Sequence, residues 1–172
     1  MKNLLSKRLV LAVTVVFFTI LCCFSVQAAE KKKVTYTKKI KQLISRADVY
    51  PGDVPKHKMS QSVRINSVTF SDPDFGTADC WAYGHLDSVA GNGTHRGYGV
   101  CHFKNGDKTY AENEGTHKTT VKEGGAWEVN YEGKIQFTGG TGKFKNIKGG
   151  GVYKGTITAK GRTEEGEMEV EY

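Results

Sequence analysis

Residues 127–153 decide the fold, and they read WEVNYEGKIQF (127–137), TGGTGKF (138–144) and KNIKGGGVY (145–153). In the first segment, apolar side chains alternate with polar ones from Trp127 to Phe137. A period of two is typical of a β-strand that covers a core on one side only. The glycines that follow permit a sharp corner, and a second strand leaves it. We therefore predict two consecutive antiparallel strands joined by a structural corner at Gly139, Gly140 and Gly142.

The same alternation recurs along the chain from Ser62 onward. It predicts strands over residues 63–70, 80–89, 95–103, 108–117, 126–137, 151–159 and 167–172. Asn105-Gly106 is a strong hairpin signal, because both residues tolerate the positive φ angles of a type I′ turn. No long amphipathic helix separates the strands, which excludes a parallel βαβ layout. The fold class is all-β, and 21 glycines favour a small, sharply coiled antiparallel barrel.

The segment ahead of these strands carries mixed signals. Val34 to Thr37 is typical of a strand, whereas Ile40, Leu43, Ile44 and Ala47 have helical spacing and predict a short helix over residues 38–48. Two prolines and a glycine make residues 50–55 a loop. We therefore expect residues 29–58 to form a basic N-terminal extension and loop, and residues 59–172 to form the barrel domain.

The first 28 residues have the features of an export signal. Lys2, Lys7 and Arg8 precede an apolar run that ends in small residues suited to cleavage after Ala28. The alternative is a membrane anchor, but the run is shorter than the ~20 apolar residues that a spanning helix needs. The expected product is periplasmic or extracellular, with no stable membrane insertion after cleavage.

Charge is distributed unevenly along the chain. Removing the three basic residues of the signal lowers the net charge from +7 to +4. Lysines crowd residues 31–41, and glutamates crowd residues 164–171. We interpret the two runs as solvated segments that pair loosely, with attachment to an anionic membrane as the alternative. No nucleic-acid partner is expected, because the protein is exported and no aromatic residues interleave with the basic ones.

The segment Gly139–Lys143 also invites comparison with a phosphate-binding loop. That motif needs a glycine where this chain has Phe137, and Ser or Thr where it has Phe144. A helix whose N-terminus would hold the phosphate is missing as well. The segment is therefore interpreted as a corner of the barrel.

The sequence FTGGTGKF (137–144) followed by IKGGGVY (147–153) resembles the corner signature of allene oxide cyclase-like and dirigent-like proteins. The match covers the corner and the following strand. The resemblance implies a single antiparallel eight-stranded barrel with an apolar interior. Such families include cyclases of fatty-acid epoxides, proteins that steer phenoxy-radical coupling, and secreted bacterial proteins without assigned activity. The cyclases' cavity glutamate and cysteine match no position here, so no catalytic role carries over.

Two cysteines, Cys80 and Cys101, remain after signal cleavage. A hairpin centred near residues 91–92 would make them diagonal neighbours on adjacent strands. An oxidising compartment favours a disulfide between them. The alternative is a pair of small buried residues.

The candidate ligand contacts are side chains expected to face the interior of the barrel. They are Trp127, Val129, Tyr131, Phe137, Tyr153, Glu112 and Glu114. The small residues at even positions from Cys80 to Leu86 predict that Tyr83 and His85 point outward. The five histidines lack metal-ligand spacing, so neither a metal nor a cofactor is expected.

These features favour an exported barrel that binds a small apolar ligand or has another non-catalytic role. The alternative is a cofactor-free cyclase or isomerase that holds a flexible substrate in a folded conformation. A lumenal carboxylate with a raised pKa would favour the enzyme. The sequence leaves the oligomeric state undetermined.

Overall fold

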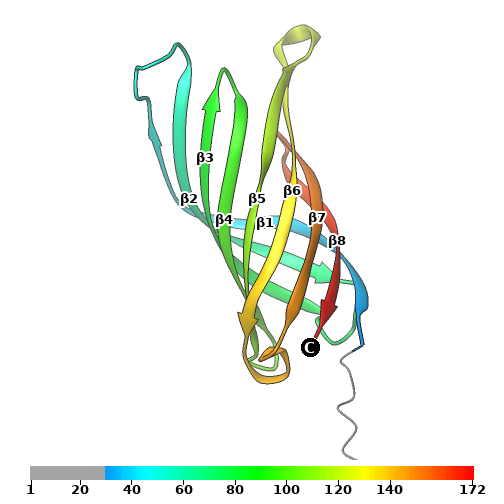
Figure 1. Cartoon of the computed structure of the whole chain (residues 1–172). Helices are drawn as coiled ribbons and strands as arrows, with labels where there is room; N and C mark the ends of the chain where they lie inside the picture. Colours follow the sequence, from blue (N-terminus) through cyan, green and yellow to red (C-terminus); the bar gives the residue numbers. More distant parts are fainter. Residues whose placement is uncertain (1–29) are drawn as a thin grey trace, which may run out of the picture.

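The computed structural model describes residues 30–172, and the export signal predicted over residues 1–28 lies outside the described residues. Eight antiparallel strands close into one barrel, which confirms the predicted fold class (Figure 1). The strands are β1 Lys32–Val49, β2 His57–Phe70, β3 Thr77–Val89, β4 Asn92–Phe103, β5 Lys108–Val121, β6 Trp127–Gly140, β7 Lys148–Thr158 and β8 Gly161–Glu171. Within this range, no helix has the length and apolarity to cross a membrane.

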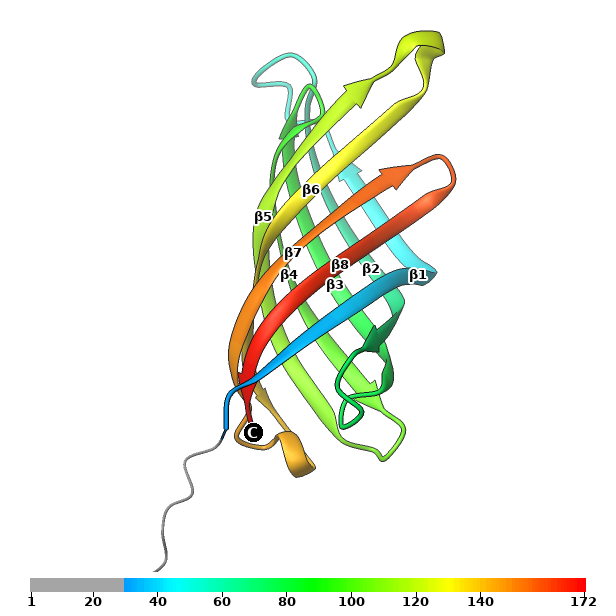
Figure 2. The same cartoon turned by 90° about the vertical axis from the view of Figure 1, so that its right-hand side faces the viewer.

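Each strand pairs with its neighbours in sequence, and β1 pairs with β8 to close the barrel. Figure 2 shows β1 lying beside β8 along this seam. The start of β1 and the C-terminus therefore lie at the same end of the molecule (Figure 1). The β1–β8 pairing covers Lys32 to Lys39, and beyond it β1 pairs with β2 alone. Closure thus removes the strand edges over that part of the barrel.

The N-terminal extension expected before the barrel is in fact its first strand, and the helix predicted over residues 38–48 is wrong. β1 runs from Lys32 to Val49 and pairs with β2 along its upper half. Register shifts between Ile40 and Gln42 and between Leu43 and Ser45 each insert an extra residue. A β-bulge advances the side-chain phase by one position. With the bulges, inward-facing residues such as Ile40 and Leu43 lie three positions apart instead of two. A spacing of three is also what an amphipathic helix shows, which explains the wrong prediction.

The end of the barrel that holds the C-terminus is packed with aromatic side chains. Phe144 is fully buried, and its ring centroid lies 4.7 Å from that of Phe75 and 4.8 Å from that of Phe103. Phe75 belongs to the β2–β3 turn and Phe144 to the β6–β7 corner, so both turns fold inward. Val34, Val170 and Met168 complete this core. We call this the closed end.

The glycine corner docks on the neighbouring β4–β5 hairpin. Thr141 accepts a hydrogen bond from the backbone amide of Lys108 at 2.9 Å, and its own amide donates to the Lys108 carbonyl at 2.9 Å. Gly142 has a φ of 55° and faces the carboxylate of Asp107 so closely that a β-carbon would overlap it. The corner is thus shaped to direct Phe144 into the barrel.

A disulfide joins Cys80 of β3 to Cys101 of β4. The two residues are direct partners in the sheet rather than the expected diagonal neighbours. The difference arises because the hairpin turns at Ala90-Gly91, one residue earlier than the expected centre. Both residues have positive φ, 51° and 81°.

Candidate functional site

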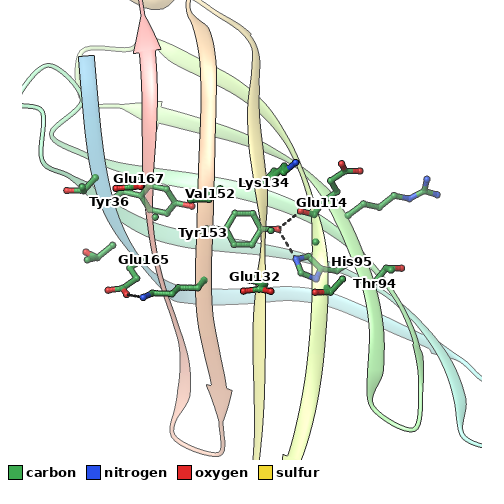
Figure 3. Close-up of a pocket in the computed structure, with 18 of the residues that line it drawn as sticks. Tyr36, Thr94, His95, Glu114, Glu132, Lys134, Val152, Tyr153, Glu165 and Glu167 are labelled. Carbon is green, nitrogen blue, oxygen red and sulfur yellow. Dashed lines mark hydrogen bonds and ion pairs between the residues drawn. The ribbon is translucent and has the colours of Figure 1, made fainter. Parts of the chain in front are cut away.

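The middle and upper parts of the barrel enclose an open lumen. Its largest cavity, of about 1460 Å³, is lined by residues from all eight strands. Further hollows of about 760 and 990 Å³ continue it towards β1 and β8 and towards β3 and β4. Figure 3 shows Tyr36, His95 and Tyr153 among the residues that line the largest cavity. The lumen is thus the main hollow among the described residues.

Three tyrosines shape the lumen by lying over glycines on neighbouring strands. Tyr36 pairs with Gly166, Tyr131 with Gly155 and Tyr153 with Gly133. A β-carbon at Gly133 would lie 2.5 Å from the Tyr153 hydroxyl, and one at Gly166 would lie 2.6 Å from the Tyr36 ring. The missing side chains let the rings lie against the wall. The hydroxyls of Tyr36 and Tyr131 then reach the carboxylate of Glu164, and that of Tyr153 reaches His95.

The carboxylate of Glu164 is the centre of a buried polar cluster. Its side chain is only 2% exposed, and Tyr36 donates a hydrogen bond to it at 3.0 Å. Arg162 forms an ion pair with it at 3.2 Å, and Lys38 forms a second. Tyr131 places its hydroxyl 3.2 Å from the same carboxylate. Buried charges are tolerated when they are paired and hydrogen-bonded in this way.

The cluster keeps Glu164 ionised. Burial alone would raise the pKa of Glu164, but the charges of Lys38 and Arg162 outweigh it and hold that pKa below its usual range. Burial lowers the pKa of Lys38, while Glu164 acts in the opposite direction. Burial also acts to lower the pKa of Arg162, but Tyr131 and Glu164 overcome it and the net shift is upward.

Arg162 also fixes the position of Tyr131. Its Nε atom donates to the Tyr131 hydroxyl at 2.7 Å, and its guanidinium lies 4.2 Å from the centroid of the Tyr131 ring. The contact combines a hydrogen bond with a cation–π interaction. Arg162 therefore fixes both the carboxylate of Glu164 and the ring of Tyr131 in the wall of the lumen.

Two histidines lie near this cluster in neutral form. Nε2 of His95 is 2.7 Å from the hydroxyl of Tyr153, and that hydroxyl donates to the backbone carbonyl of Glu114 at 3.3 Å (Figure 3). Burial, with the charge of Arg162, lowers the pKa of His95 to about 4. Burial likewise lowers the pKa of His117, whose two ring nitrogens have no hydrogen-bond partner among the described residues.

The structure places the predicted aromatic contacts at different depths. Tyr131 and Tyr153 are buried in the wall of the lumen, whereas buried Phe137 belongs to the closed end. Val129 is half-buried. Trp127 is 44% exposed and lies at the outer end of β6, where it pairs with exposed Val121.

The side chains of Glu112 and Glu114 point to the outer face, although both residues border the hollows of the barrel, and their role as ligand contacts stays a prediction. Both side chains are exposed, while Ala111 and His117 of the same strand are buried. Alternation along β5 sends odd-numbered residues inward and even-numbered ones outward. Only the backbone carbonyl of Glu114 contacts an inward-facing group, the Tyr153 hydroxyl.

Sequence reasoning missed the charged residues of the lumen, which include Lys38, Arg64, Arg162 and Glu164. Glu164 and Lys38 were assigned to solvated charge runs, yet they are sheet partners inside the barrel. A signal was present, since Arg162 and Glu164 share the even parity of buried Met168 and Val170. Lys38 likewise shares the parity of Val34 and Tyr36. In a closed barrel, parity places a side chain inside whatever its charge.

The donor set does not resemble a metal site. In residues 30–172, no three His, Cys, Asp or Glu side chains form a group able to hold a metal ion. The lumenal groups are instead tyrosines, histidines, lysines and arginines around the carboxylate of Glu164. Hydroxyl, imidazole and guanidinium groups together suit an organic molecule with polar substituents.

Comparison with known proteins finds no matching family model and no matching curated protein. Among solved structures, the chain is similar to the pterocarpan synthase dirigent protein PsPTS1, with a TM-score of 0.48 and 13% identity over 83% of this chain and 96% of that one. It is also similar to the pterocarpan synthase dirigent protein GePTS1, with a TM-score of 0.45 and 16% identity over 85% of this chain and 88% of that one. Dirigent proteins are one of the two groups that the corner sequence resembles.

Proposed function

We propose that this protein is an exported barrel that binds a small molecule with an apolar body in its lumen, without catalysis. The observation that carries the proposal is the cavity of about 1460 Å³ in the middle of the barrel. An eight-stranded barrel has an interior just wide enough to be filled by side chains or to hold one small ligand. Here the inner face carries glycines where large side chains would fill it, and these are Gly84, Gly97, Gly99, Gly115, Gly133, Gly151, Gly155 and Gly166.

The electrostatics of the lumen favour binding over acid–base chemistry at Glu164. A general acid at neutral pH needs a carboxyl whose pKa is raised. The cations beside Glu164 lower its pKa instead, so the group stays ionised and accepts hydrogen bonds. We therefore assign Glu164 to orienting Tyr36 and Tyr131 around the ligand.

Export is part of the proposal, supported by the signal-like sequence of residues 1–28 and by the disulfide between Cys80 and Cys101. Disulfides persist in oxidising compartments and are rare in the cytosol. N-terminal sequencing of protein recovered from the periplasm or the medium is expected to begin at Ala29. A mature protein beginning at Met1 would refute cleavage.

Ligand binding is tested with N-phenyl-1-naphthylamine, a neutral dye whose fluorescence rises in apolar surroundings. Gly99 lies two residues from Gly97, which lines the hollow of about 990 Å³, on the same inner face of β4. Gly99→Leu adds a side chain that can reach towards that hollow, at a glycine where a β-carbon would make only ordinary contacts, 3.7 Å from the Trp81 carbonyl. Val100→Leu, at the adjacent outward position of the same strand, is the matched control. We expect the dye to bind the wild type and the control, and to bind Gly99→Leu at least tenfold more weakly.

Two results would contradict the proposal. The first is a wild-type protein that leaves the dye fluorescence unchanged at millimolar protein. The second is equal affinity in Gly99→Leu and Val100→Leu, which would place the dye on the outer surface. Cooperative urea unfolding of both variants shows that the comparison is made between folded proteins.

A second candidate function rests on His95 and Tyr153. A neutral imidazole hydrogen-bonded to a tyrosine hydroxyl inside an apolar-walled lumen can relay a proton in a cyclisation or isomerisation. The test incubates the protein with a small-molecule extract and recovers the retained compounds. An isomerase yields a compound of unchanged mass and altered retention time, and Tyr153→Phe abolishes it. Recovery of only unaltered compounds supports binding without catalysis.

A further inference from the structure

The charged side chains inside the barrel do not balance. Lys38, Arg64 and Arg162 point inward, and Glu164 is the carboxylate among them. Lys38 and Arg162 are both ion-paired with Glu164. At the rim, Arg46 and Asp48 pair with each other at 2.9 Å. Lys58 at the start of β2 also faces inward, because it has the parity of buried Ser60, and its charge adds to burial in lowering the pKa of His117. The described residues of the lumen thus carry excess positive charge, and Arg64 and Lys58 are the cations without a carboxylate partner, with Arg64 farther along the strand from the rim.

Arg64 is a half-buried guanidinium on the inner face of β2. It is the sheet partner of Ala82, and it extends towards Gly84, where a β-carbon would lie 2.5 Å from its Nη2 atom. Among residues 30–172, no carboxylate lies within 4.0 Å of it, and no oxygen accepts a hydrogen bond from its side chain. Burial, assisted by the charge of Arg162, lowers the pKa of Arg64 to about 10, so it remains charged at neutral pH.

The half-buried guanidinium of Arg64 has no partner in the described chain, and its nitrogens are not among the fully buried atoms, so water reaches them. A carboxylate or sulfonate would replace that water and match the planar fork with two parallel hydrogen bonds. A ligand with such a group would supply the partner that the described chain lacks.

The surroundings of Arg64 define the rest of that ligand. Leu43 is its sheet partner on β1, and Ile40 is the partner of Asn66, so both lie on the inner face. Yet Leu43 is 54% exposed and Ile40 is 39% exposed. Apolar side chains that face inward and still contact solvent border unfilled space. The guanidinium is thus flanked by an apolar surface on the β1 side.

We propose that the lumen selects small organic acids, with the acid group on Arg64 and the apolar body against Ile40 and Leu43. This inference rests on the proposed function and adds the ligand class to it. A bound monoanion would reduce the excess positive charge that Lys38, Arg64 and Arg162 leave beside Glu164. Neutral molecules of the same shape would leave Arg64 unpaired.

The test uses two dyes that share one scaffold. 8-Anilinonaphthalene-1-sulfonate carries a sulfonate, and N-phenyl-1-naphthylamine lacks it. Both are titrated by fluorescence at pH 7 and low salt against the wild type, Arg64→Met and the control Lys104→Met, whose lysine is exposed in the β4–β5 turn away from the lumen. A hydrogen-bonded charge contact of this kind corresponds to about tenfold or more in affinity. We expect Arg64→Met to lose that factor for the sulfonate dye alone, and Lys104→Met to match the wild type.

A second measurement needs no variant and covers the case in which Arg64→Met does not fold. 2-Naphthoate and 2-naphthamide, an anion and a neutral molecule of nearly the same shape, compete with the bound neutral dye on the wild-type protein. We expect naphthoate to displace the dye at a concentration at least tenfold lower than naphthamide does.

The outcomes separate the two proposals. If the neutral dye binds but naphthoate and naphthamide displace it equally, the lumen binds ligands and the preference for acids is wrong. The same conclusion follows if a folded Arg64→Met keeps the wild-type affinity for the sulfonate dye. If neither dye binds the wild type, the proposed function fails, and the inference fails with it.

Discussion

The two ends of this barrel are built from the same alternating strands and yet have opposite interiors. At the closed end, Phe75 and Phe144 enter from the turns and pack against Phe103 and Tyr172. In the upper part, the inward positions carry Glu164, Arg162, Lys38 and two histidines around open space. Strand pairing continues through both regions, so the sheet itself does not account for the difference.

The comparison teaches that the turns determine where this barrel is filled. Both inward-folding turns carry an aromatic residue and a glycine of positive φ, Gly76 in one and Gly142 in the other. The β5–β6 connection at the opposite end has glycines of positive φ at 124 and 125 but exposes its residues. Closure of one end stabilises the fold, and openness of the other leaves room for a ligand.

The largest loss of stability is expected from Phe144→Ala at the closed end. Removing a fully buried aromatic ring costs about 3–5 kcal/mol of unfolding free energy, because a cavity replaces its contacts. Urea denaturation measures the loss, with the exposed neighbour Lys145→Ala as the control. Dye affinity in the lumen is expected to change less than threefold. A parallel collapse of dye binding would show that the two ends are one cooperative site.

The next largest effect is expected from the disulfide, which lies on the inner face between the two regions. Replacing Cys80 and Cys101 together by Ala is expected to cost about 2–4 kcal/mol, because the bridge restricts the unfolded chain. Denaturation of the wild type with and without a reductant provides the control. A variant as stable as the oxidised protein would contradict a stabilising role for the bridge.

A pH titration distinguishes the polar region from the closed end. The folded-state pKa of His95 is about 4, below its ordinary 6.5, so the unfolded chain binds more protons between these values. Stability therefore falls as pH drops from 6.5 towards 4. Glu164, whose folded pKa is lowered, contributes stability above its ordinary pKa of 4.5 and loses it only below that value.

The measurement compares unfolding free energies of the wild type and His95→Gln at pH 7.0, 6.0 and 5.0. The wild type is expected to lose more stability over this range than the variant, because glutamine does not titrate. Equal slopes would mean that His95 is as accessible to protons in the folded protein as in the unfolded chain.

The smallest effect is expected on the outer face. Glu112→Gln and Glu114→Gln should each change stability by less than about 0.5 kcal/mol and leave dye affinity unaltered, because both side chains are exposed to solvent. Fluorescence titration checks the affinity. A tenfold loss of dye affinity in either variant would show that the residue contacts the ligand and would contradict its assignment to the outer face.

The barrel and its corner could be predicted from the sequence because alternation and glycine turns are local signals. β1 could not, since its bulges arise only when it pairs with β2, the next strand along the chain. The polar cluster was hidden for another reason. Lys38 and Glu164 are charged residues of a kind usually found on the surface. Their position along the strand places them inside only because the sheet closes into a barrel. Arg64 shared the parity of Asn66 and Val68 but carried no motif.

The seam between β1 and β8 also governs the order in which the molecule can form. Lys32 pairs with Val170 and Lys38 with Glu164, contacts that span nearly the whole described chain. Non-local pairs of this kind form slowly, because a long loop must close before they gain any energy. The hairpins from β2 to β7 can assemble first, whereas the ion pair between Lys38 and Glu164 forms only when β8 pairs with β1. The barrel is thus expected to close late, only once β8 has joined β1.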